Sequence, residues 1–88
     1  MSPEQCRAAR AWLNWPQDAL AKAASVGVST VRDFEARRRE PTRNNLAAMK
    51  VALESGGIGF VFDGEGRASG ITFAAPLGNG AVDENQEI

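Results

Sequence analysis

The sequence predicts a mainly helical protein that ends in a short β-hairpin. Two observations indicate this fold class. Apolar residues recur at helical spacing through the first 57 residues, and a proline or a capping residue precedes each expected helix. After Gly56-Gly57 the pattern changes to two short β-branched and aromatic runs around a glycine-rich turn. At 88 residues the chain forms one small domain, which buries only about 60% of its unfolded surface.

The first helix is expected from Pro3 to about Leu13. Ser2 suits the N-cap position, and Gln5 completes a capping box with it. The apolar residues of this segment form one stripe: Cys6, Ala9 and Leu13, with Trp12 at its edge. Pro16 disfavours a helical conformation at Trp15, so the helix should end before this pair.

Residues 17–24 and 28–36 are predicted to form two short helices joined by a tight turn. Their apolar residues fall where two helices crossing at a steep angle would bury them: Leu20, Ala21, Ala24, Val26, Val31 and Phe34. Ser25 and Gly27 bracket the turn, and Gly27 lies where the second helix needs an N-cap. This arrangement is a helix-turn-helix, whose second helix can enter the major groove of DNA.

A further helix is expected from about Arg43 to Ser55. Pro41 keeps the preceding connection from extending as helix, and Thr42 can cap the new one. The expected apolar set of this helix is Leu46, Met49, Val51 and Leu53. Gly56-Gly57 provides the C-terminal glycine signal that ends it.

The hairpin is expected over residues 58–74, with strands at 58–62 and 70–74 and a turn at 63–66. Because an isolated hairpin is barely stable in water, it must pack on the helices of its own chain or pair with another chain. We expect it to be a dimerisation element. Residues 75–88, rich in Gly, Asn and acidic residues, are expected to be a disordered tail. Residues 1–57 are expected to form the DNA-binding domain.

Charge is distributed unevenly along the chain. Residues 1–57 hold nine Lys and Arg against six Asp and Glu, a net charge of +3, whereas residues 58–88 hold one against five, a net charge of −4. Four arginines follow the second helix of the helix-turn-helix: Arg37, Arg38, Arg39 and Arg43. Such a run can be a solvated helix end, but beside a helix-turn-helix it favours contact with DNA phosphates.

Several classes of function are disfavoured by composition. The chain has no His and a single cysteine, Cys6, so it offers neither an internal disulfide nor a zinc site and suits a reducing cytoplasm. It has no run of about 18 apolar residues that could span a membrane. No nucleophile lies near a base and no Gly-rich loop opens a helix, so an enzyme, a metal site and a cofactor are not expected.

The helix-turn-helix resembles the Cro/repressor-like (XRE-type) family of DNA-binding proteins over roughly residues 3–57. The matching pattern is Gln17-x-x-Leu20-Ala21, then Ala24-x-Val26, then Thr30-Val31-x-x-Phe34-Glu35. The resemblance implies a lambda-repressor-like domain of four to five helices. It also implies a transcriptional regulator, a repressor that binds an inverted repeat of double-stranded DNA as a homodimer, located in the cytoplasm and at the nucleoid when bound. The alternative is a protein-interaction module, such as an antitoxin or co-regulator, whose hairpin or tail holds a protein partner.

The resemblance also implies roles for individual residues. The family reads bases with outward-facing side chains on the first turns of the second motif helix, which here are Val28, Ser29, Arg32 and Asp33. Asp33 could accept from cytosine or instead orient Arg32, and Val28 and Ser29 could merely start the helix. Arg10 and Glu35 match a buried ion pair of the family.

Further residues are expected at the DNA backbone. The resemblance assigns phosphate contacts to Gln17, whose alternative is an exposed helix starter, and to Thr30, whose role is also partly structural. Asn44 and Asn45 lie at the start of the last helix, where they either contact phosphate or only cap the end of the helix.

The chain departs from the family pattern at three positions. Pro16 and Gly27 stand where the family usually has polar helix caps, and Arg37 stands where it often has Gly. Arg37 therefore either adopts a left-handed conformation, at a cost of about 1 kcal/mol, or the helix continues through it.

Overall fold

The computed structural model describes residues 1–73, and the expected mainly helical fold with a C-terminal hairpin is confirmed. Its elements are α1 (Pro3–Leu13), α2 (Gln17–Ala24), α3 (Val28–Glu35), α4 (Arg43–Ser55), β1 (Ile58–Phe62) and β2 (Ala68–Phe73). Four helices are therefore present within the described residues. Ala74 and the tail expected over residues 75–88 lie outside them.

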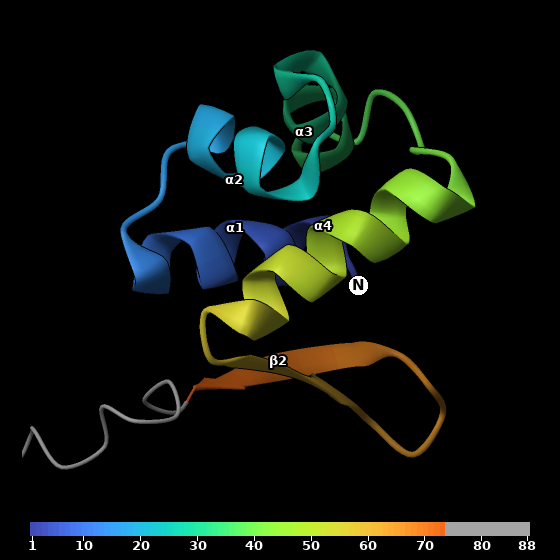
Figure 1. The fold of residues 1–88 in the computed structure, drawn as a ribbon. Coiled ribbons are helices and arrows are strands. Elements are labelled where there is room, and N and C mark those ends of the chain that lie inside the picture. Colours follow the sequence, from blue (N-terminus) through green and yellow to red (C-terminus); the bar gives the residue numbers. More distant parts are fainter. Residues whose placement is uncertain (74–88) are drawn as a thin grey trace, which may run out of the picture.

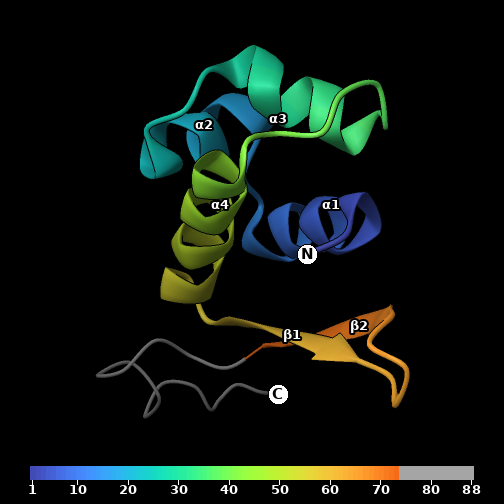
Figure 2. The ribbon, with the colours of Figure 1, turned by 90° about the vertical axis from the view of Figure 1, so that its right-hand side faces the viewer.

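The elements form three layers (Figures 1 and 2). The pair α2 and α3 lies at one end, α1 and α4 form the middle, and the hairpin lies against α1 and α4 at the opposite end. Buried side chains from every layer meet in one core: Cys6, Ala9, Leu20, Ala21, Ala24, Val31, Phe34, Met49, Ala52, Leu53 and Ile58. The recognition motif and the hairpin thus occupy opposite ends of one packed unit.

The helix boundaries have local causes. The capping box at the start of α1 is complete, since Ser2 Oγ accepts from the N–H of Gln5 and Gln5 Oε1 accepts from the N–H of Ser2. Asn14 ends α1 in the left-handed region at φ 60°. Thr42 caps α4 by accepting from the N–H of Asn45, while Pro16 and Gly27 provide no side-chain cap for α2 and α3.

Val51 differs from the expected pattern of α4, and Trp12 lies exposed at the edge of the apolar stripe of α1. Val51 is 58% exposed, so its assignment to the apolar face of α4 was wrong; the buried face is carried by Met49, Ala52 and Leu53. Val51 lies two residues from Met49 and from Leu53, which at 3.6 residues per turn places it on the opposite face. Trp12 is 55% exposed, and its ring stacks on that of Phe73 at a centroid distance of 3.5 Å.

The hairpin packs on the helices of its own chain. Ile58 is buried in the core, and Phe60 and Ile71 pack against it. The strands are antiparallel, with Ile58 opposite Phe73, and an irregularity between Val61 and Phe62 pairs Phe62 with Ala68. β2 begins at Ala68, two residues earlier than expected, because Phe62 still has a partner beyond Gly70 and the bulge shifts that partner by one further residue, from Ser69 to Ala68.

Gln5 joins α1 to both strands. Its side chain is 3% exposed, and Nε2 donates to the carbonyl oxygens of Val61 at 3.0 Å and Gly70 at 2.8 Å. Seven residues further along α1, Trp12 stacks on Phe73. Seven helical residues and three strand residues both span about 10 Å, so α1 and β2 run alongside each other in the same direction.

Candidate nucleic-acid interface

The turn between α2 and α3 fixes the motif geometry. Ser25 takes a left-handed conformation at φ 57°, and the N–H of Val26 donates to the carbonyl of Ala21 at 2.9 Å. Val31 and Phe34 are buried, so they anchor the inner face of α3 in the core. One face of α3 therefore packs against the core, and the opposite face is exposed to solvent.

The outer face of α3 presents three of the four expected base-reading residues. Val28 is 44% exposed, and Ser29 and Arg32 are also exposed. Asp33 is half-buried, and its Oδ1 lies 3.7 Å from Arg32 Nε and 3.3 Å from an Arg38 nitrogen. Asp33 therefore lies between two guanidinium groups, an arrangement suited to orienting Arg32.

The arginines after α3 differ in their surroundings. Arg37 adopts the left-handed conformation at φ 59°, so α3 ends at Glu35 rather than continuing to Ala36. Its Nη2 donates to both carboxylate oxygens of Glu4, at 2.7 and 2.6 Å. This hydrogen bond lowers the pKa of Glu4.

Arg39 and Arg43 are exposed, and neither forms an ion pair with any acidic side chain of residues 1–73. A hollow of about 190 Å³ opens between α3 and the start of α4, lined by Thr30, Asp33, Arg39, Glu40, Pro41, Thr42 and Asn45. Asn44 is exposed at the start of α4, whereas the N–H of Asn45 is used by the cap. Thr30 and Arg39 thus line one hollow, and Asn44 is exposed next to Asn45, which also lines it.

A family model described as helix-turn-helix matches residues 7–55, which include most of α1 and all of α2, α3 and α4. The chain belongs to the XRE-type helix-turn-helix family. It is therefore a DNA-binding regulator of transcription, and the expected resemblance is confirmed. No curated protein matches the chain.

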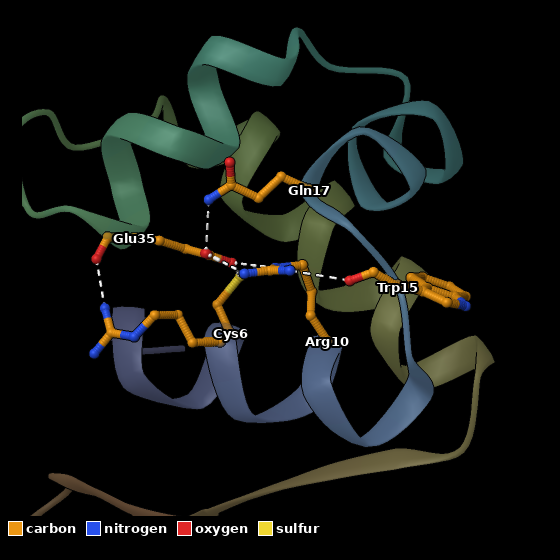
Figure 3. A network of polar contacts seen from close by, with 6 residues as sticks. Cys6, Arg10, Trp15, Gln17 and Glu35 are labelled. Carbon is orange, nitrogen blue, oxygen red and sulfur yellow. Dashed lines mark hydrogen bonds and ion pairs between the residues drawn. The ribbon is translucent and has the colours of Figure 1, made fainter.

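Beneath the motif, the carboxylate of Glu35 lies at the centre of a buried polar cluster (Figure 3). Arg10 binds it through two contacts of 2.7 Å, Nε to Oε2 and Nη2 to Oε1. Cys6 Sγ donates to Oε2 at 3.1 Å, and Gln17 Nε2 donates to Oε1 at 3.0 Å. Arg10 also donates to the carbonyl of Trp15 at 2.9 Å. The cluster ties α1, the start of α2 and the end of α3 together.

Burial and hydrogen bonding act in opposite directions on this cluster. Burial disfavours the charge of Glu35, but hydrogen bonds from Arg10, Gln17 and Cys6 outweigh it and lower its pKa. Burial, and then the hydrogen bond to Glu35, raise the pKa of Cys6, so the thiol stays protonated. The hydrogen bond to Glu35 raises the pKa of Arg10. A charged pair held in this way fixes geometry more than it adds stability.

The sequence assigned Gln17 to a phosphate and did not foresee its contact with Glu35. It also missed Cys6 as a donor and Gln5 as a link to the hairpin. Of these three residues, only Gln5 could have been singled out from the sequence. A glutamine that completes a capping box has a side chain held in one orientation, which makes it available for a further contact.

No helix within residues 1–73 is long and apolar enough to cross a membrane. The same residues contain no group of three or more His, Cys, Asp or Glu side chains that could hold a metal ion.

Proposed function

We propose that the protein is a repressor that inserts α3 into the major groove and binds an inverted repeat as a homodimer. The observation that carries this proposal is the outer face of α3, where Ser29 and Arg32 project while Val31 and Phe34 lock the inner face. Arg32 can donate two hydrogen bonds to guanine O6 and N7, Ser29 can contact either base type, and Val28 can meet a thymine methyl. Asp33 contributes to base reading by orienting the guanidinium group of Arg32.

The margin of the motif supplies the phosphate contacts. Arg39 and Arg43 are free to meet the backbone, and Thr30 and Asn44 supply neutral donors beside them. Arg37 and Arg38 can reach phosphate only by leaving Glu4 and Asp33, so we expect them to contribute less.

Gln17 acts at the start of α2. One hydrogen of its amide is used on Glu35, and the other can still donate to a phosphate. Pro16 provides no side-chain cap, so the first N–H groups of α2 also remain for an anion. Gln17 would then connect the bound phosphate to the buried cluster.

The homodimer follows from the small reading surface. An α3 of eight residues contacts only a few base pairs, and proteins of this kind gain specificity by placing two recognition helices about one DNA turn apart. Such a regulator works at the nucleoid in the cytoplasm.

A second candidate is a protein-interaction module. The observation in its favour is the exposed apolar surface of the hairpin, where Val61, Phe62 and Phe73 are 38%, 42% and 50% exposed. The polar outer face of α3 and the unpaired arginines beside it favour DNA instead.

The test compares a selected DNA site with random DNA. Ser29→Ala and Arg32→Ala should each weaken binding to the selected site by about 1–3 kcal/mol and change binding to random DNA little, because a lost base contact removes only specific affinity. Ser55→Ala changes the same residue type as Ser29 away from α3 and should leave the ratio of the two affinities unchanged. Equal losses on both DNAs would exclude Ser29 and Arg32 as base readers.

A further inference from the structure

Within residues 1–73, only β1 pairs with β2, so the outer edge of β2 has no strand partner there. Residues 68–73 contain no charged residue and no proline. Natural edge strands use such residues to avoid pairing with other chains. The edge of β2 therefore lacks the usual protection against a further strand.

The surface beside this edge is open and is lined by both small and charged side chains. A hollow of about 610 Å³ lies between the first half of α1 and the start of β2, where Ser2, Glu4, Gln5, Ala8 and Arg37 line it together with residues 67–71. Ala8 and Ala11 are both exposed on α1. Small side chains let another backbone approach α1 closely.

We propose that the outer edge of β2 binds β2 of a second copy in antiparallel orientation and so forms a four-stranded sheet. The proposal rests on the proposed function, which requires two copies. A second copy suits this edge because a two-fold axis pairs β2 with itself, and an uncharged strand then places no like charges opposite each other.

The arrangement of layers favours this edge-to-edge contact. A two-fold axis that relates antiparallel neighbours in one sheet runs perpendicular to the sheet. The helices of both copies then lie on the same face of the sheet. Because α3 lies at the far end of that helical layer, both recognition helices point the same way (Figure 2). Stacking two hairpins face to face would instead point them in opposite directions.

Charge distinguishes β2 from β1 as the pairing edge. Lys50 Nζ lies 5.9 Å from the ring centroids of both Phe60 and Phe62 on β1, so pairing through β1 would bring two ammonium groups toward the axis. At β2 the charged side chains beside the hollow are paired within the chain, Arg37 with Glu4 and Arg67 with Asp63 and Glu65. The exposed stack of Trp12 on Phe73 would gain cover from the second copy.

The test is the oligomeric state without DNA, measured by sedimentation over a range of concentrations. The unmodified chain should dimerise, and Ala8→Glu should raise the dimer dissociation constant by about 100-fold, because like charges facing each other across an interface strongly disfavour association. Val51→Glu places the same charge on the exposed face of α4 and should leave the constant unchanged. A monomer at all concentrations, or a dimer disrupted by Val51→Glu but not by Ala8→Glu, would overturn the proposal.

Amide hydrogen exchange gives a second reading that does not depend on a variant. Protection of β2 should rise with protein concentration while protection of β1 stays constant; protection of β2 that is independent of concentration would mean that its own chain covers the edge, against the proposal. Failure of the proposed DNA-reading function would be seen in DNA binding and not in the oligomeric state. Ala8→Glu should still prefer one half-site over random DNA, whereas a dimer without any base preference would refute DNA reading and leave the β2 interface intact.

Discussion

At the scale of single residues, Glu35 decides how α3 is held. It lies at the end of α3, is 4% exposed, and receives hydrogen bonds from α1 and α2. Base reading requires that a helix be placed to within a fraction of an ångström, and a charged pair with four directed contacts supplies that precision better than apolar packing does. In the proposed function, the cluster therefore positions the helix that reads the bases.

This role predicts a pH-dependent cost for Glu35→Gln. At neutral pH the variant should lose about 3–5 kcal/mol of unfolding free energy, because Arg10 is left partly buried without its partner. The pKa of Glu35 is lowered from 4.5, so its charge stabilises the fold above that pH, and the stabilisation is lost as pH falls through the folded-state pKa. Urea unfolding from pH 7 to pH 3 should show the gap to the unmodified chain narrowing on acidification.

Glu54→Gln is the matched control. Glu54 is exposed and makes no ion pair within residues 1–73, so its variant should track the unmodified chain at every pH. A gap for Glu35→Gln that stayed constant with pH would contradict the assigned role of the Glu35 charge.

At the scale of elements, capping residues and apolar periodicity predicted where the helices lie. The start of β2 and several side-chain contacts depend on tertiary packing and could not be predicted in this way. Ser2 and Thr42 marked two helix starts because capping acts within a few residues. The start of β2 depended on the partner of Phe62 across the hairpin and on the bulge that moves this partner to Ala68, neither of which a local sequence pattern reports. In the candidate site, the exposure of Ser29 and Arg32 follows from helical periodicity, whereas the contacts of Gln17 with Glu35 and of Arg37 with Glu4 depend on how α1 crosses α2 and α3.

The contacts of Gln5 with both strands predict that a change in α1 alters the stability of the hairpin. Gln5→Met keeps the length of the side chain but removes both hydrogen bonds to the strand carbonyls, so exchange of the β1 and β2 amides should accelerate while that of α2 and α3 changes little. Ser2→Ala removes the cap of α1 and leaves the contacts of Gln5 with the strands in place. If the two variants loosened the hairpin equally, Gln5 would act only through the helix cap.

At the scale of the whole molecule, charge and layers divide the chain into two ends. The end with α3 carries the unpaired Arg39 and Arg43, whereas the hairpin, residues 58–73, holds Arg67 against Asp63 and Glu65, a net charge of −1. In the proposed complex, this division of charge would direct the end with α3 toward DNA and keep the hairpin away from phosphates. The overall charge of −1 therefore conceals a surface suited to DNA.

The division predicts how salt affects binding. Arg39→Ala combined with Arg43→Ala should weaken binding to all DNA sequences alike and flatten the plot of log affinity against log salt concentration by about one unit per lost contact. Arg37→Ala removes an arginine held by Glu4 and should flatten the slope less. An unchanged slope in the double variant would remove Arg39 and Arg43 from the phosphate contacts.

The central claim is that α3 reads DNA sequence for a two-fold dimer, and selection of bound DNA from a random double-stranded pool tests it most directly. The account predicts enrichment of one sequence arranged as an inverted repeat, with half-site centres about 10 base pairs apart. It also predicts that Arg32→Ala enriches a different or less defined sequence. No enriched sequence, or the same sequence enriched by Arg32→Ala and the unmodified chain, would contradict it.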